Sequence, residues 1–355
     1  MVRTMSLITA LPSLRAVPRS LRSLTGTARR LPRRSAAASA ADRDDEVLLD
    51  VPDARLAPVL VAAADGDHGP AARLLAATRA TAAWEDRDRH LTRLAAFALS
   101  RDEWLSGWLT AAPGDPDALL VAAGRAVLRA WDSPARAELL HEVGPLVDAA
   151  AAGDPRDPVP WRIALDHARG VHATHTGFEA LWEQALRRSR WHYGCHVAAL
   201  RYLSAQWHGS HRECFDFAEQ AADDAPPGSL VRALPVRAAF ACLAGGGQPA
   251  AVRARIDGAA DRAIALSAGY GPGEALLAEV RNLLVYVLIS RERWAEALEQ
   301  FRLIGPDVTS FPWARLSDDP LGLFLELRGT ARLLTAPGGA RRDRAGRTGA
   351  RGHYA

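Results

Sequence analysis

The sequence predicts an all-α protein in which antiparallel helix pairs stack as an α-solenoid. Ala and Leu dominate a composition that is 48% hydrophobic but only 6% aromatic, which favours helices with small-residue contact faces. Between residues 54 and 335, apolar residues recur three and four positions apart, with short Pro, Gly and Asp signals separating the runs. No stretch alternates Val, Ile and Thr as a strand does.

The chain begins and ends with basic segments that flank an acidic body. Residues 1–41 hold eight Arg and no acid, and residues 341–355 hold five Arg and one Asp. The residues between them hold 31 Arg against 40 Asp and Glu. We expect residues 1–53 and 336–355 to be largely disordered basic segments, and we expect no nucleic-acid-binding surface on the folded body.

Helix start signals divide the body into short elements. Asp115 is the expected cap of a helix within 114–131, with Pro116 at its first position, and residues 153–170 repeat this pattern. The Gly-rich stretch 244–250 predicts a hinge between a helical region at 54–244 and a second one at 245–335. Further helices are expected at 84–99, 102–111, 134–151, 176–190, 193–206, 211–224, 229–244, 249–267, 273–289, 293–304 and 319–334.

One stretch of the sequence recurs after 36 residues. "HATHTGFEALWEQA" (172–185) aligns with "HGSHRECFDFAEQA" (208–221), so that Thr174 matches Ser210 and both copies end in Glu-Gln-Ala. A period near 34 to 36 residues is typical of solenoids built from helix-turn-helix units.

The stretch "RERWAEALEQF" (291–301) resembles the second helix of a tetratricopeptide-like repeat. Trp294, Ala297 and Phe301 occupy its aromatic and small packing positions, while Glu292 stands where such repeats usually place a small residue. The stretches "YLSAQWHGSHRECFDFA" (202–218) and "FPWARLSDDPLGLF" (311–324) are also similar to uncharacterised helical-repeat proteins of GC-rich bacteria. This resemblance implies an interaction scaffold without catalytic residues, which binds a protein or peptide on a concave face lined by Arg and aromatic side chains.

Four histidines lie in the recurring joints, and stacking would place them on one rim: His172, His175, His208 and His211. They could hold a metal ion or supply a surface whose charge depends on pH, or they could lie there only because Thr174 and Ser210 cap the helices that follow. We favour capping, because the spacing matches no zinc signature, and keep a metal-dependent protein as the alternative function.

The remaining candidate side chains are interpreted as packing residues. His192 and His196 share a helix face but lie too far along their helix to share a metal with Cys214. We expect His196 at the edge of the core with a hydrogen bond, and we expect tryptophans such as Trp182 and Trp207 to anchor the packing.

Several chemistries are excluded by missing residues. All 44 basic residues are Arg, so no P-loop, Schiff-base or kinase lysine exists. The thiol of Cys214 has His211 nearby in sequence, but nothing supplies an oxyanion hole, so we expect no catalytic residue and no cofactor. Three cysteines without a C-x-x-C pair suit a reducing compartment, and no apolar run is long enough to span a membrane, which favours a cytoplasmic protein.

Overall fold

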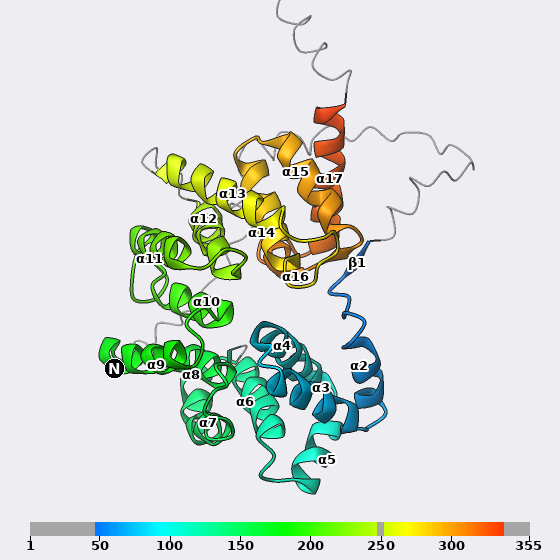
Figure 1. Cartoon of the computed structure of the whole chain (residues 1–355), viewed down its shortest axis with the longest axis vertical. Helices are drawn as coiled ribbons and strands as arrows, with labels where there is room; N and C mark the ends of the chain where they lie inside the picture. The colour runs from blue at the N-terminus through cyan, green and yellow to red at the C-terminus, as the bar shows by residue number, and fades with distance from the viewer. Residues whose placement is uncertain (1–46, 132, 247–251, 337–355) are drawn as a thin grey trace, which may run out of the picture. The chain divides into compact units, whose positions relative to one another are not determined.

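The structure of the chain, a computed structural model, describes residues 47–131, 133–246 and 252–336 (Figure 1). Regular structure in these residues is helical, apart from the two-residue strands β1 (Leu48–Leu49) and β2 (Asp307–Val308), which pair in parallel. The predicted all-α class is therefore confirmed. The basic segments expected at either end lie almost wholly outside the described residues.

The described residues form two compact units. Unit A comprises residues 52–234, and unit B comprises residues 47–51 together with 235–336. The helix α12 (Leu234–Ala244) belongs almost entirely to unit B because it packs on α14 (Ala278–Ser290) there. Phe240 lies edge-on to Tyr286 at 5.3 Å, and Arg237 forms an ion pair with Glu279. The division between the two units falls before α12, and most of the expected hinge at 244–250 lies outside the described residues.

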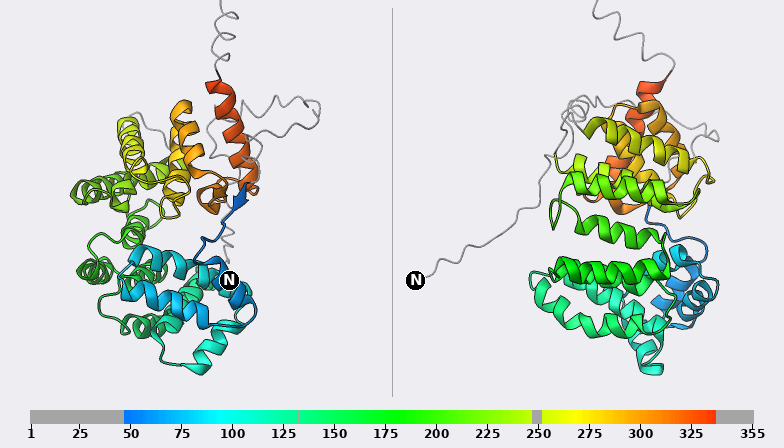
Figure 2. Two further views of the ribbon diagram at one scale, coloured as in Figure 1. Left: turned by 45° about the vertical axis from the view of Figure 1, so that its right-hand side comes forward. Right: turned by 60° about the vertical axis from the view of Figure 1, so that its left-hand side comes forward.

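In unit A, alternate helices along the chain pack against one another. α4, α6, α8 and α10 contact one another in succession, while α5, α7, α9 and α11 each pack on neighbours along the chain. Figure 2 shows the green helices of this unit stacked side by side. The helices are α2 (Ala57–Ala64), α3 (Gly69–Ala80), α4 (Trp84–Ser100), α5 (Glu103–Ala111), α6 (Pro116–Trp131), α7 (Arg136–Ala151), α8 (Val159–Gly170), α9 (His175–Arg188), α10 (Tyr193–Tyr202), α11 (His211–Asp224) and the 3-10 helix η3 (Leu230–Ala233).

The predicted caps begin their helices as expected. The Asp115 carboxylate accepts hydrogen bonds from the backbone N–H of Asp117 and Ala118, and Thr174 Oγ1 accepts one from Gly177 N at 3.2 Å. One half of the predicted capping box forms, because Ser210 Oγ accepts from Glu213 N at 3.2 Å. The Glu213 carboxylate accepts from the Ser210 hydroxyl at 2.7 Å rather than from the Ser210 backbone N–H.

Several expected boundaries were wrong, among them the following three. α8 begins at Val159 rather than near 153, because residues 154–157 form a turn and the Asp157 carboxylate accepts from Val159 N. α10 ends at Tyr202 rather than at 206. There the chain folds back so closely that a side chain at Gly209 would meet the Leu203 carbonyl oxygen at 2.3 Å. α14 begins at Ala278 rather than at 273.

A buried arginine joins four segments of unit A. Arg87 of α4 is 1% exposed. Its Nη2 donates to Asp117 of α6 and its Nε to Asp157 before α8, both at 2.6 Å, while its Nη1 donates to the Leu75 carbonyl of α3 at 2.8 Å. The guanidinium has a partner on each side, as a buried charge requires.

Unit B is built around α14, whose residues from Val280 to Ser290 are all buried. α13 and α15 pack on it, as do α16 and β2. The Arg281 guanidinium of α14 donates to the carbonyls of Ser267, Tyr270 and Gly271 and so holds the turn after α13. The other helices of the unit are α13 (Arg253–Ser267), α15 (Trp294–Ile304), α16 (Ser310–Trp313) and α17 (Pro320–Thr335).

Two segments distant in sequence meet at the strands of unit B. The backbone N–H of Asp50 donates to Val308 O at 2.6 Å, and the Asp50 carboxylate accepts from Ser310 N at 2.9 Å and from the Ser310 hydroxyl. We call this contact between residues 48–50 and 306–310 the clasp. No helix within the described residues combines the length and the apolar character that a membrane crossing demands.

Candidate functional site

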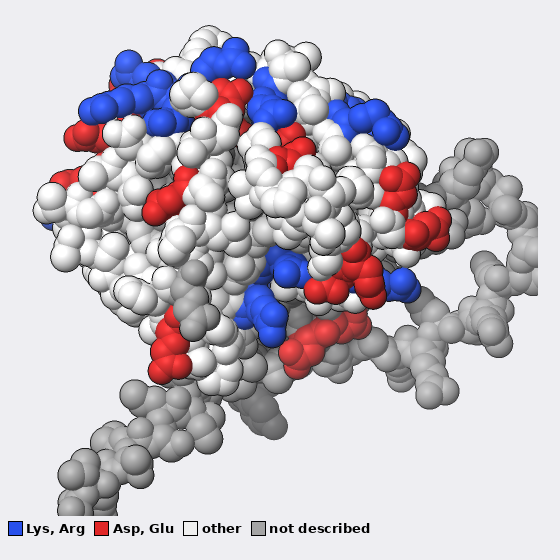
Figure 3. All heavy atoms as spheres, turned by 90° about the horizontal axis from the view of Figure 1, so that it is seen from below, with Lys and Arg blue, Asp and Glu red and all other residues white. Residues whose placement is uncertain are grey.

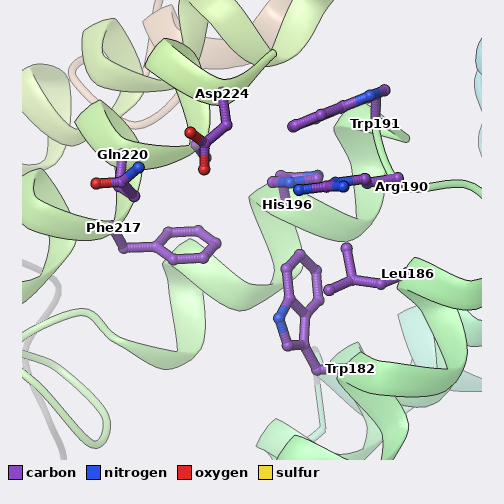
Figure 4. A pocket seen from close by; sticks show the side chains of 9 residues that line it. Trp182, Leu186, Arg190, Trp191, His196, Phe217, Gln220 and Asp224 are labelled. Carbon is purple, nitrogen blue, oxygen red and sulfur yellow. The ribbon is translucent and has the colours of Figure 1, made fainter.

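An open groove lies on unit A between α9, α10 and α11 (Figure 4). Its volume is about 260 Å³. Residues one and two helical turns apart form its walls, because such residues share a helix face: Trp182 and Leu186 on α9, and Phe217, Ala221 and Asp224 on α11. The lining residues are Trp182, Leu186, Arg190, Trp191, His196, Phe217, Gln220, Ala221 and Asp224.

Four rings frame the groove. The Trp182 ring stands edge-on to the His196 ring, with centroids 5.0 Å apart, and lies 5.8 Å from Phe217. His196 lies nearly parallel to Trp191 at 6.3 Å and to Phe217 at 6.1 Å. These offset and edge-to-face arrangements are the favourable ones for aromatic pairs, so the groove has firm apolar walls.

His196 forms the floor as a neutral ring. It is 3% exposed, and its Nδ1–H donates to the His192 carbonyl at 3.0 Å, since a carbonyl oxygen can only accept. Burial lowers the pKa of His196 to about 4, although the hydrogen bond to the carbonyl opposes this shift. The expected position at the core edge, with a hydrogen bond, is what the structure shows.

The side chains of Arg190, Gln220 and Asp224 in the groove form no hydrogen bond or ion pair with other described residues. Arg190 only places its guanidinium over the Trp191 ring, 4.9 Å from the centroid. The groove thus offers one cation, one carboxylate and one amide beside its rings (Figure 4).

The structure brings three of the four rim histidines together through a residue that sequence reasoning missed. Tyr202, the last residue of α10, stacks with His208 at 4.5 Å and with His175 at 5.9 Å. His172 meets His208 at 6.1 Å, whereas His211 takes part in no ring contact among the described residues. The sequence feature that could have predicted this contact is a tyrosine at the end of a helix, close to the two histidine-containing turns.

The row of rings continues beyond the histidines. His172 contacts Trp207 at 5.3 Å, and Trp207 meets Trp131 edge-on at 5.5 Å. Arg169 places its guanidinium 4.2 Å from the Trp131 centroid, and Arg136 lies at 4.9 Å. We call this row the rim cluster.

Ring contacts, rather than ligand geometry, characterise the rim cluster. Across the part of the chain that the structure describes, no three His, Cys, Asp or Glu side chains are grouped so that they could hold a metal ion. The alternative of a metal-dependent rim therefore gains no support from the arrangement of its histidines.

A second pair of side chains was also missed from sequence. His192 Nδ1 lies 3.2 Å from Cys195 Sγ, and neither residue is exposed. Burial raises the pKa of the Cys195 thiol, and the attraction of His192 only partly offsets this rise. Burial thus disfavours the thiolate that a nucleophilic cysteine needs. His192 caps α10, because its side chain accepts a hydrogen bond from Cys195 N. In the sequence, this pair could have been found from a histidine that directly precedes a helix and lies three residues before a cysteine.

Cys214 and the four expected packing anchors are buried or half-buried. Cys214 is buried, with Sγ directed at the Leu203 carbonyl at 3.2 Å. Phe301 is 2% exposed and meets Phe324 edge-on at 5.0 Å, whereas Trp182, Trp207 and Trp294 are half-buried. Two of these half-buried tryptophans belong to the groove and the rim cluster.

Both signs of charge lie on the face drawn in Figure 3, scattered over a mostly uncharged surface. That face presents no single sign of charge.

Comparison of the chain with protein-family models, with curated proteins and with solved structures finds no match. The chain is an all-α protein with an open aromatic groove on unit A.

Proposed function

We propose that this protein is a non-catalytic helical scaffold, and that unit A binds a protein or peptide partner in the groove between α9, α10 and α11. The single observation that carries the proposal is the groove itself. Four rings line an open groove, together with three polar side chains that form no hydrogen bond or ion pair among the described residues. Aromatic anchors in such hollows dominate the binding energy of protein interfaces.

The packing of unit A supports a tetratricopeptide-like solenoid as the framework of this scaffold. α4, α6, α8 and α10 contact one another in succession, as the first helices of stacked pairs do. The capped joints before α9 and α11 recur 36 residues apart, from Thr174 to Ser210. Scaffolds of this architecture present extended binding surfaces.

Site-specific photo-crosslinking tests the proposal. A photoreactive phenylalanine analogue replaces Gln220 in the groove, and a matched analogue replaces Leu99, an exposed residue of α4 that does not line it. Both chains are irradiated in extract of the cells that naturally express the protein. We expect a discrete covalent adduct at position 220 and none at position 99, and we expect Trp191→Ala to abolish the adduct.

Equal labelling at positions 99 and 220, or an adduct that survives Trp191→Ala, would contradict a partner site in the groove. Circular dichroism of each variant checks that its helix content is unchanged.

A further inference from the structure

We infer that the groove takes up the side chain of a tyrosine from the partner. This inference rests on the proposed function and specifies its chemistry. It follows from the volume of the groove, from its walls and from the charges that face it.

The volume matches one side chain. Sites that enclose a whole small molecule measure roughly 300–1,000 Å³, whereas this groove measures about 260 Å³. The groove is also open to solvent, which lets a side chain enter while the rest of the partner lies outside.

The walls favour a flat ring. Trp182, Phe217 and Trp191 present faces and edges around the hollow, with His196 between them (Figure 4). A further aromatic ring gains edge-to-face and offset contacts here that an aliphatic chain cannot make.

The charges favour a neutral ring over an ion. Arg190 and Asp224 are the two charged lining residues, and His196 is neutral. A cationic side chain would enter beside the Arg190 guanidinium, and an anionic one beside the Asp224 carboxylate. Each ion would be attracted by one of these groups and repelled by the other, so the groove offers no net charge to offset the desolvation of an ion, a cost that a neutral ring does not carry.

The hydrogen-bonding groups select a hydroxyl. Asp224 can only accept a hydrogen bond, and Arg190 can only donate one. A phenol hydroxyl both donates and accepts, so it is complementary to either group. An indole N–H only donates, and a phenylalanine ring does neither. In Figure 4 the two side chains reach the space between the rings from different sides.

The test follows the indole N–H signals of Trp182 and Trp191 by NMR in the full chain, assigned with Trp182→Phe and Trp191→Phe. The probes are the N-acetyl amides of Tyr, Phe, Trp, Arg and Glu, titrated to tens of millimolar. We expect the tyrosine amide to shift both signals and to bind about tenfold more tightly than the phenylalanine amide, as expected for a hydrogen bond to a charged group.

A conservative variant isolates the hydroxyl contact. Asp224→Asn should reduce the preference for tyrosine over phenylalanine to less than about threefold and leave phenylalanine binding unchanged, because only the charged acceptor is lost. Asp148→Asn, an exposed carboxylate of α7 outside the groove, serves as control and should retain the full preference.

Four results would overturn the inference: tighter binding of the arginine amide, equal binding of the tryptophan amide, an unchanged preference in Asp224→Asn, or no shift with any amide. If the photo-crosslink at position 220 forms all the same, only the choice of tyrosine fails. If that crosslink is also absent, the proposed function fails with it.

Discussion

At the scale of single residues, we expect the guanidinium of Arg87 to make a large contribution to the free energy of unfolding. It neutralises Asp117 and Asp157, which are each 2% exposed. Arg87→Met leaves both carboxylates buried without their main partner, so we expect a loss of about 3–5 kcal/mol in the free energy of unfolding, measured with urea.

The control for this substitution is Arg125→Met. Arg125 pairs with Asp102 at 2.9 Å, but the Asp102 side chain is 57% exposed. Loss of this ion pair should therefore lower the free energy of unfolding by less than about 1 kcal/mol. Equal losses in the two variants would show that the Arg87 ion pairs do not stabilise the fold.

His196 links acidity to the stability of the groove. Its pKa of about 4 in the folded chain lies below the value of about 6.5 for an unfolded chain. The unfolded chain therefore binds more protons, and stability is lost as pH falls from about 6.5 towards 4. At pH 5 we expect a loss on the order of 1–2 kcal/mol relative to pH 7.

Urea unfolding at both pH values, compared between the natural chain and His196→Phe, measures this loss. The variant lacks the titrating group, so its stability should change less between pH 7 and 5. The same loss in both chains would assign the pH dependence to other residues.

At the scale of the helices, the close packing of α7 on α8 depends on Gly170, which has no side chain. A Cβ at Gly170 would lie 2.2 Å from Leu140 Cδ1 and 3.2 Å from the Trp131 ring. Gly170→Ala should therefore destabilise unit A by about 1–3 kcal/mol through overpacking, as measured by thermal unfolding.

Gly107→Ala in α5 is the matched control. A Cβ there meets nothing within 4 Å, so the better helix propensity of alanine should stabilise the chain by about 0.5–1 kcal/mol. A stabilising Gly170→Ala would show that the Leu140 side chain or the two helices can shift without cost.

Sequence reasoning located helices best where a side chain caps the first turn. Asp115, Thr174 and Ser210 mark their starts because they accept a backbone N–H two or three residues later. It failed where tertiary contacts decide, as at the tight turn around Gly209 that ends α10. The strands β1 and β2 are too short to leave a pattern.

The candidate site was predictable only in part, for a related reason. The recurrence at 36 residues located the rim histidines, but the groove assembles from three helices and a turn. Trp191 and Arg190 lie in that turn, where helical periodicity does not predict where their side chains point. Trp182 was expected as a packing anchor, yet half-buried at the groove it is also a wall.

At the scale of the whole molecule, the clasp ties unit B together across 260 residues of sequence. Asp50→Ala removes the acceptor for Ser310 N and places alanine at a φ of 57°, which asparagine and aspartate tolerate better. We expect faster hydrogen exchange at Ser310 and in α16, with no change in α4 and α6 of unit A.

Asp50→Asn is the control, because it keeps an acceptor oxygen and tolerates the same backbone conformation. Its exchange pattern should stay close to that of the natural chain. Faster exchange throughout unit A in Asp50→Ala would contradict a local role for the clasp.

The clasp also bears on the order in which the units can be completed during synthesis. Unit A is one continuous stretch, so all of its residues have left the ribosome once residue 234 has emerged. Unit B begins earlier in the chain, yet its first strand has no partner until residues 307–308 arrive. Because domains fold as units while the chain grows, the inserted unit can form first, and the unit that encloses it in sequence closes last.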